Sequence, residues 1–277
     1  MAFNAFIAPE TIHPSLWRAS QLARGTGVYV ASGHVALSAE LPGGGWPGGA
    51  LTEILIQHQG TAELSLLQAA LASLKQGHII FLQAPYQPQA FALSELGLDL
   101  SQLLWIRCSK HADALWTAEQ ILRSASCAAL LFWQSQVKTE SLRRLHLAAQ
   151  SGRTLFFMMR PPEYAHSPSP APLRLKLSTA ASGLQIDFIK RRGAQQHAPL
   201  LLDFPLLASM YAHGKHPTNI DVNHHSAHHA AHHTVKAKSH SIAKLFASRL
   251  AAEGRALTQQ DEDETEGDNN KNAVEME

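Results

Sequence analysis

Five short apolar runs, separated by stretches with helical periodicity, most constrain what this chain can fold into. The runs lie at residues 51–56, 78–83, 103–107, 128–133 and 154–159. They lack polar alternation, as expected of strands that are covered on both faces. The stretches between them, at 62–75, 87–96, 111–125 and 139–150, carry apolar residues at helical spacing. This order predicts an α/β fold with a mostly parallel sheet flanked by helices.

The pattern changes after Arg160. A proline-rich segment at 161–172 cannot continue a helix and is expected to form a loop. Two segments at 173–178 and 184–190 then alternate apolar and polar residues around Ser182-Gly183, which predicts an antiparallel hairpin at the edge of the sheet. We therefore expect an N-terminal helical segment at 1–30 and one compact α/β domain at 31–205.

The remaining residues, 206–277, form a histidine-rich and then acidic segment of low complexity. Little apolar surface is available there for burial, so a disordered tail is predicted. Histidine pairs recur every four residues from His224 to His233, and a helix would align them for nickel or zinc. A solvated linker is the preferred interpretation, and no metal site is predicted.

Composition sets further limits. The chain has 277 residues, of which 45% are hydrophobic, so it can bury one substantial core. Its net charge of +1 does not by itself require a nucleic-acid partner. Cys108 and Cys127 lie in apolar runs, which favours a reducing compartment without disulfides. With neither a signal peptide nor a membrane-length apolar run, a cytoplasmic protein without membrane contact is expected.

A glycine-rich stretch at 42–49 precedes the first strand of the predicted sheet, and the turn after that strand is where a nucleotide-binding domain would carry its phosphate loop. Such a loop needs several glycines, a lysine and a serine or threonine hydroxyl. This turn instead offers Gly60, Thr61, Ala62 and Glu63, with no lysine or arginine before Lys75. A carboxylate would repel a phosphate, so we interpret the turn as a degenerate phosphate loop that holds no cofactor.

A nucleotide-hydrolysing site also needs an acidic residue at the end of a neighbouring strand. The strand at 128–133 ends in Trp133-Gln134, and the next carboxylate is that of Glu140. We therefore expect no catalytic residues and no enzyme activity. A basic cluster, Lys190, Arg191, Arg192 and Gly193, follows the last predicted strand; it is either a solvated strand end or a contact for phosphate or a partner.

The order of short patterns resembles known families. The sequence LPGGGWPGG at 41–49, followed by Thr52-Glu53-Ile54, resembles the start of the ATPase core of RecA recombinases. The segments HPSLWR at 13–18, ELPGGGWP at 40–47, DALWTAEQ at 113–120, PSPAPLRL at 168–175 and KRRG at 190–193 resemble the ImuA family of translesion-synthesis accessory proteins. Residues 49–176 also resemble the division inhibitor SulA, a shorter relative.

The resemblance implies a RecA-like fold from which parts are missing. The phosphate-loop lysine and glycines are absent, and Arg160 replaces the glutamine expected at the end of the strand at 154–159. The segments that would hold two DNA-binding loops are short, at 134–139 and 161–172. ATP-gated filament formation on DNA is therefore not expected.

The ImuA resemblance implies a non-catalytic adaptor of SOS-induced translesion synthesis. Its expected partners are ImuB, an inactive Y-family polymerase homologue, and an error-prone DnaE-type polymerase, with RecA and DNA as further contacts. The basic cluster and the residues beyond it are the expected partner surface. The alternatives are a SulA-like inhibitor of the division protein FtsZ, against which the N-terminal helix and glycine-rich stretch argue, and an active ATPase.

Overall fold

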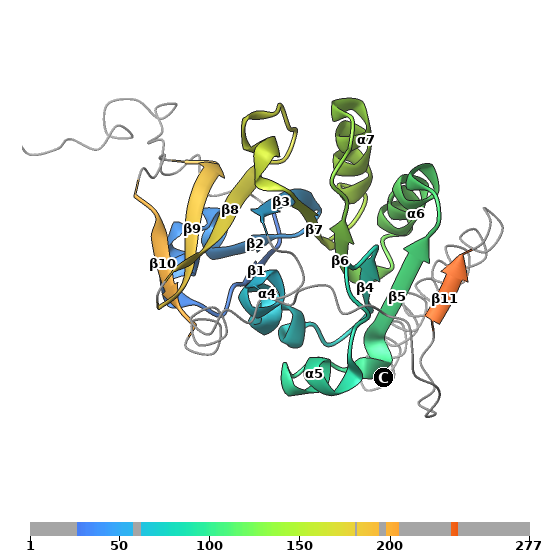
Figure 1. Cartoon of the computed structure of the whole chain (residues 1–277), viewed down its shortest axis with the longest axis horizontal. Helices are drawn as coiled ribbons and strands as arrows, with labels where there is room; N and C mark the ends of the chain where they lie inside the picture. Colours follow the sequence, from blue (N-terminus) through green and yellow to red (C-terminus); the bar gives the residue numbers. More distant parts are fainter. Residues whose placement is uncertain (1–26, 58–61, 181, 194–197, 205–233, 238–277) are drawn as a thin grey trace, which may run out of the picture.

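The computed structural model describes residues 27–57, 62–180, 182–193 and 198–204, and the backbone of 234–237. A nine-stranded mixed sheet runs through the molecule in the order β10-β9-β8-β3-β7-β6-β4-β5-β11 (Figure 1). Its strands are β3 (Ala50–Ile56), β4 (His78–Leu82), β5 (Leu103–Cys108), β6 (Cys127–Trp133), β7 (Leu155–Arg160), β8 (Leu173–Ala180), β9 (Gly183–Lys190), β10 (Leu200–Asp203) and β11 (Thr234–Ala237).

The described helices alternate with the parallel strands. They are α3 (Val35–Glu40), α4 (Ala62–Ser73), α5 (Ala90–Glu95), α6 (His111–Ser124) and α7 (Thr139–Ala149), with short 3-10 turns η1 (Pro42–Gly44), η2 (Leu100–Gln102) and η3 (Pro162–His166). The helices cover two separate apolar cores on opposite faces of the sheet. Apolar residues of α3, α4 and α5 pack on one face of the sheet, and those of α6 and α7 pack on the other.

The predicted fold class is confirmed. Strands β3 to β7 are parallel to their neighbours, and β8 and β9 form the predicted antiparallel hairpin, with β8 parallel to β3. Two edge strands were not predicted. β10 is antiparallel to β9, and β11, which lies within the segment predicted to be a disordered tail, is parallel to β5. The other tail residues, the histidine pairs and the N-terminal helix lie outside the described residues.

The glycine-rich stretch has a structural role at the amino end of the sheet. It forms η1 and β2 (Gly45–Pro47), which pairs with β1 (Tyr29–Ala31). Backbone oxygens of the turn before β7 would lie 2.6 Å and 2.5 Å from a Cβ atom at Gly48 and Gly49, and Gly49 has a φ of +67°. Trp46 is fully buried and packs edge-on against Phe157 at 5.3 Å between ring centroids. The glycines thus permit close backbone packing.

Two further expectations concern cysteines and membranes. Cys108 and Cys127 are both buried and free of disulfides, as predicted. Full burial raises the pKa of the Cys127 thiol to about 11, so it is protonated at neutral pH. None of the helices in the described part of the chain is both long and apolar enough to cross a membrane.

Candidate functional site

The degenerate phosphate turn lies between the carboxyl end of β3 and the start of α4. β3 ends at Ile56 and α4 begins at Ala62. Gly60 and Thr61 lie outside the described residues. Ala62 and Glu63 form the first turn of α4 and are buried, with 1% and 0% of their surface exposed. A carboxylate is therefore enclosed where a phosphate-binding domain would present a lysine to its ligand.

Glu63 is bonded to the other residue that the sequence singled out. The indole nitrogen of Trp133, the last residue of β6, donates a hydrogen bond of 2.9 Å to Glu63 Oε1. The indole also packs edge-on against Phe81 of β4, with 5.7 Å between the ring centroids. Trp133 is 5% exposed. A buried bond between a carboxylate and an indole therefore ties α4 to the ends of two strands.

This pair lies where α/β proteins commonly bind ligands, at the carboxyl ends of parallel strands. A phosphate site there requires cations or free backbone donors. The pair supplies a negative charge, and its indole donor is already used by that charge. The arrangement is suited to holding helix and strands together and is unfavourable for an anion.

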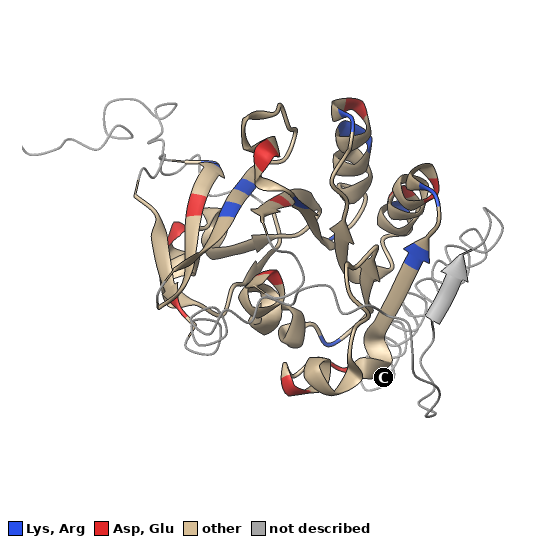
Figure 2. Cartoon of the chain, viewed as in Figure 1, with Lys and Arg blue, Asp and Glu red and all other residues tan. Residues whose placement is uncertain are grey.

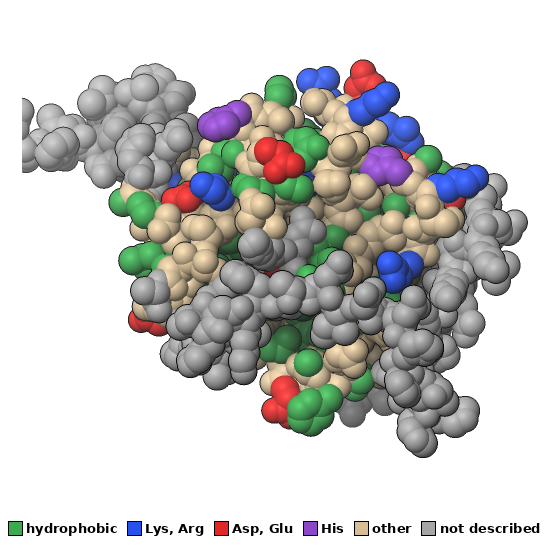
Figure 3. Space-filling view, in the orientation of Figure 1, with side chains coloured by type: hydrophobic (Ala, Val, Ile, Leu, Met, Phe, Trp, Pro, Cys, Tyr) green, Lys and Arg blue, Asp and Glu red, His purple; other side chains and the backbone are tan. Residues whose placement is uncertain are grey.

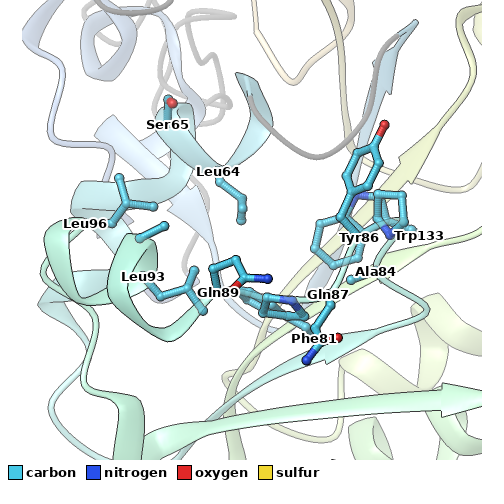
Figure 4. A pocket seen from close by; sticks show the side chains of 13 residues that line it. Leu64, Ser65, Phe81, Ala84, Tyr86, Gln87, Gln89, Leu93, Leu96 and Trp133 are labelled. Carbon is cyan, nitrogen blue, oxygen red and sulfur yellow. The ribbon is translucent and has the colours of Figure 1, made fainter. Parts of the chain in front are cut away.

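An apolar hollow adjoins the pair, between α4 and α5 (Figure 4). Its volume is about 370 Å³. Side chains from α4, α5 and the ends of β4 and β6 line its walls: Leu64, Ser65, Phe81, Leu93, Leu96 and Trp133. Its rim is the segment from Ala84 to Gln89, which contains two prolines and two glutamines. The hollow therefore offers an apolar floor with amide groups at its margin.

Two exposed aromatic residues belong to this region. Tyr86 lines the hollow and is 48% exposed, and Phe91, next in sequence to the lining residue Ala92 in α5, is 79% exposed. Exposed apolar groups that adjoin an apolar depression are typical of protein-binding surfaces. The hollow, with the exposed Tyr86 among its lining residues, is the described surface best suited to an apolar side chain of a partner.

A buried ionic cluster lies on the α7 side of the sheet and was not predicted. Glu53 of β3 accepts hydrogen bonds from Arg160 of β7 at 2.9 Å and from Arg174 of β8 at 2.5 Å. The side chains are 0%, 2% and 6% exposed. Removing one partner from such a cluster leaves an uncompensated charge in the core. The three residues therefore hold the central strand and its two neighbours together.

The same arginines fix the loop at 161–172. Arg174 donates to the carbonyl oxygens of Tyr164 and Ala165 at 2.7 Å and 3.0 Å. The Arg160 guanidinium lies 4.2 Å from the centre of the Tyr164 ring. Arg160, which the sequence marked as a departure from the recombinase pattern, therefore pairs with a buried carboxylate and positions this loop.

The residues of the basic cluster at 190–193 have different environments. Lys190 donates to the carbonyl oxygen of Ser169 at 3.1 Å. Arg191 donates to the carbonyl oxygen and to the carboxylate of Glu40 at 2.6 Å and 2.7 Å, which ties the end of β9 to α3. These two side chains contribute to intramolecular contacts.

Arg192 and Gly193 are exposed. Figure 2 shows further basic residues on β8, α6 and α7, and Figure 3 shows basic side chains gathered over the outer side of α6 and α7. Lys190 is exposed as well, with its ammonium bonded to Ser169, and Arg192 carries the second exposed charge of the cluster. Whether the cluster binds a partner stays a prediction.

His146 of α7 lies close to this cluster. Its Nδ1 atom accepts a hydrogen bond of 3.3 Å from the backbone N–H of Leu51 at the start of β3. Burial lowers the pKa of His146, and the charges of Lys190 and Arg192 lower it further. The ring is therefore neutral at neutral pH and acts as an acceptor that joins α7 to β3.

The described residues contain no group of three histidine, cysteine, aspartate or glutamate side chains able to hold a metal ion. The histidine pairs at 224–233 lie outside this part of the chain. Sequence analysis missed the ionic cluster, although a signal was present. Glu53 and Arg160 are charged residues within or at the end of largely apolar strands, and buried charges of this kind require partners. Arg174 gave no such signal, because its strand alternates apolar and polar residues.

Comparison with known proteins gives a partial likeness. No protein-family model matches the chain. Over 84 residues, which are 30% of this chain, the sequence is 29% identical to the cell division inhibitor SulA of Edwardsiella piscicida. The matched part spans about half, 50%, of that relative. The resemblance to SulA seen in the sequence is thus supported as a distant likeness over part of the domain.

Proposed function

We propose that this chain is a non-catalytic adaptor of SOS-induced translesion DNA synthesis. The segments that resemble the ImuA family support this proposal, and the partial likeness to SulA agrees with a place in the DNA-damage response. In this role the protein acts in the cytoplasm and holds together ImuB and an error-prone DnaE-type polymerase, with RecA or DNA as further contacts.

One observation carries the non-catalytic part of the proposal. The buried bond between Glu63 and Trp133 links the two positions where an ATPase needs a cation and a carboxylate. A negative charge enclosed beside the phosphate turn disfavours nucleotide binding, since like charges repel in a medium of low dielectric constant. The pure protein is therefore expected neither to bind nor to hydrolyse ATP. ATP hydrolysis whose rate changes in Glu63→Ala would overturn this part of the proposal.

The adaptor role requires a partner surface, for which the hollow beside α5 and the exposed Arg192 are the candidates. Phe91→Ser removes the exposed aromatic ring of α5, the helix that forms one wall of the hollow, and is expected to leave the free energy of unfolding within about 0.5 kcal/mol. Val35→Ser is a matched control, because Val35 is 90% exposed and begins α3. Both variants lose one exposed apolar side chain from the first turn of a short helix.

The partner test combines affinity isolation with a cellular measurement. After DNA damage, the full-length protein is expected to co-isolate a Y-family-like polymerase homologue, and Phe91→Ser to reduce the recovered amount at least fivefold while Val35→Ser does not. Damage-induced mutation frequency should fall in parallel in a strain that carries only Phe91→Ser. Recovery of no polymerase component from damaged cells would contradict the adaptor proposal. Equal recovery with both variants would instead remove the hollow as the contact.

A second candidate function is inhibition of cell division. It is favoured by the likeness to a cell division inhibitor over 84 residues. In that role the partner is FtsZ rather than a polymerase. Overproduction distinguishes the two functions: filamentous cells with unchanged mutation frequency indicate the inhibitor, and normal cell length with raised damage-induced mutation frequency indicates the adaptor.

A further inference from the structure

The outer face of α6 and α7 carries a concentration of positive charge. Residues 110–153, which include both helices, contain six lysine and arginine residues against three carboxylates. All six cations are exposed: Lys110, Arg123, Lys138, Arg143, Arg144 and Arg153. Of the carboxylates, Glu119 is buried, Asp113 is half-buried and Glu140 is exposed. We call this surface the basic face; Figure 3 shows basic side chains gathered over it.

The helices on the other side of the sheet have the reverse balance of charge. Residues 62–102, which include α4 and α5, contain one cation, Lys75, and two exposed carboxylates, those of Glu95 and Asp99. The apolar hollow lies on this side. A surface of one sign attracts a ligand of the opposite sign and repels one of its own. A polyanion is therefore directed to the basic face and away from the hollow.

Two arginines of the basic face are held side by side by one carboxylate. Arg123, in the last turn of α6, donates to Glu119 Oε1 at 2.9 Å, and Arg144 of α7 donates to Glu119 Oε2. The carboxylate is 7% exposed, whereas the arginine side chains are 62% and 65% exposed. A guanidinium has five N–H donors, so both groups keep donors that face solvent. Holding the two in place in advance lowers the entropy lost when they bind a phosphate.

The cations extend along α7. Arg143 and Arg144 lie on its exposed side, Lys138 precedes the helix and Arg153 follows it. Residues 138–150 span about 18 Å along the helix axis, which is the axial length of about five nucleotides in one strand of B-DNA. A small phosphate ligand is normally enclosed in a pocket. Cations spaced along an exposed helix instead fit a polymer with regularly repeated phosphates.

The aromatic side chains of this region favour a duplex over a single strand. Proteins that bind single-stranded nucleic acid stack its bases on exposed aromatic rings. Trp116 is half-buried, and Phe132 and Trp133 are buried. Contacts from arginine and lysine to the backbone need no access to the bases and carry no sequence information. The basic face is therefore suited to the backbone of a double helix, without sequence preference.

We propose that the basic face, with Arg123, Arg143 and Arg144 at its centre, binds the phosphodiester backbone of double-stranded DNA. This inference rests on the proposed function for the choice of DNA as the polyanion, and it gives the DNA contact of that function a place in the fold. DNA on the basic face and a protein partner at the hollow occupy opposite faces of the sheet. The two can therefore be bound at the same time.

Binding of purified full-length protein to a labelled duplex of about 30 base pairs tests the basic face. At about 0.1 M salt, fluorescence anisotropy should show binding at least tenfold weaker in Arg143→Glu, with a slope of log K against log salt that is less steep by about 1. Lys75→Glu is the matched control, because it reverses one exposed cation on the other side of the sheet. It should weaken binding less than threefold. Equal weakening by the two variants would overturn the proposal, since binding would then follow net charge alone.

The arginine pair is tested without a change of net charge. Glu119→Gln/Arg144→Gln removes one charge of each sign and leaves Arg123 a neutral acceptor in place of the carboxylate. Binding to the duplex should weaken at least threefold in this variant, although its net charge equals that of the wild-type protein. Unchanged binding would show that the pair does not contact DNA and would contradict its place at the centre of the site.

Two further outcomes bear on the ligand. Failure of the wild-type protein to bind duplex DNA at low salt would overturn this inference, whereas the adaptor proposal fails only if no polymerase component is co-isolated from damaged cells. The two failures are therefore distinguishable. A labelled single strand of the same length is expected to bind no more tightly than the duplex. Tenfold tighter binding of the single strand would show that the assignment to double-stranded DNA is wrong.

Discussion

The indole N–H of Trp133 and the carboxylate of Glu63 form a hydrogen bond of 2.9 Å that joins the end of β6 to the first turn of α4. Both residues are almost completely buried. A buried carboxylate is stable only while donors satisfy it, so the indole is part of what allows Glu63 to occupy this place. Glu63 and Trp133, which lie where an ATPase would carry a lysine and an acidic residue, are thus one structural unit.

Trp133→Phe tests this unit. The variant keeps an aromatic ring against Phe81 but removes the indole donor, and we expect the free energy of unfolding to fall by about 1–3 kcal/mol. Urea denaturation measures the loss. A double-mutant cycle with Glu63→Met, which removes the acceptor, should give a coupling of about 1 kcal/mol or more, as found for residues in direct contact. Strict additivity of the two single changes would show that the bond contributes nothing.

Glu53→Gln is expected to be far more damaging. It leaves the guanidinium groups of Arg160 and Arg174 in the core without their counter-charge, which should lower the free energy of unfolding by about 3–5 kcal/mol. Glu163→Gln, at an exposed position of the loop that these arginines fix, is a suitable control and should change stability by less than about 0.5 kcal/mol.

Replacement of the whole ionic cluster gives the complementary result. In Glu53→Leu/Arg160→Met/Arg174→Met no charge is left unpaired, so we expect most of the stability lost in Glu53→Gln to be recovered. The arginine hydrogen bonds to the carbonyls of Tyr164 and Ala165 are lost in this variant. Amides of the loop at 161–172 should therefore exchange faster while those of β3 remain protected. A triple variant less stable than Glu53→Gln would contradict this account.

Neighbouring arginines in the basic cluster should behave differently. The Arg191 side chain is 12% exposed and is bonded to Glu40, so Arg191→Ala is expected to lower the free energy of unfolding by about 1–3 kcal/mol. Arg192→Ala should leave stability unchanged and weaken only partner binding. Thermal denaturation and affinity isolation of the two variants separate these roles. Equal destabilisation by both changes would contradict the different roles assigned to Arg191 and Arg192.

Stability should depend on pH through His146. Its pKa is lowered below the ordinary value of 6.5 by burial and by the charges of Lys190 and Arg192. Between the folded and unfolded pKa values the unfolded chain binds more protons, so the free energy of unfolding rises with pH in that window. We therefore expect stability to decrease as pH falls below about 6.5.

His146→Gln provides the comparison for this pH dependence. A glutamine side chain offers an acceptor for the Leu51 N–H but does not titrate. His34, whose pKa is also lowered chiefly by burial, is present in both proteins. The difference between their urea-denaturation profiles across pH 5–8 therefore isolates His146. Parallel profiles would mean that His146 does not contribute.

Much of the fold was predictable because its signals are local. Apolar runs and helical periodicity gave β3 to β9 and α4 to α7 within a few residues, since strands covered on both faces need continuous apolar sequence. β10 and β11 were missed for a physical reason. Each is a short edge strand held by backbone pairing to one neighbour, and such pairing leaves little mark in the sequence of four residues.

The candidate site was predictable only in part. Sequence analysis identified Glu63 and Trp133 as departures from an ATPase, but it gave no indication that the two side chains are bonded across 70 residues. Similarly, the functions of Arg160 and Arg191 follow from partners that lie 107 and 151 residues away in the chain. Chemistry that depends on such pairs is set by the packing of the sheet, which residue spacing does not reveal.

The glycine-rich stretch lies at the amino end of β3, whereas the phosphate turn follows its carboxyl end. Seven residues of extended strand, about 23 Å, separate the two. Gly48 and Gly49 are explained by close packing against the backbone of the turn before β7, and this explanation needs no ligand. Different residues in the phosphate turn at the other end of β3 therefore leave the packing requirement for these glycines unchanged. In this chain the glycine-rich stretch therefore indicates how the sheet is closed, and it carries no information about a nucleotide at the other end of β3.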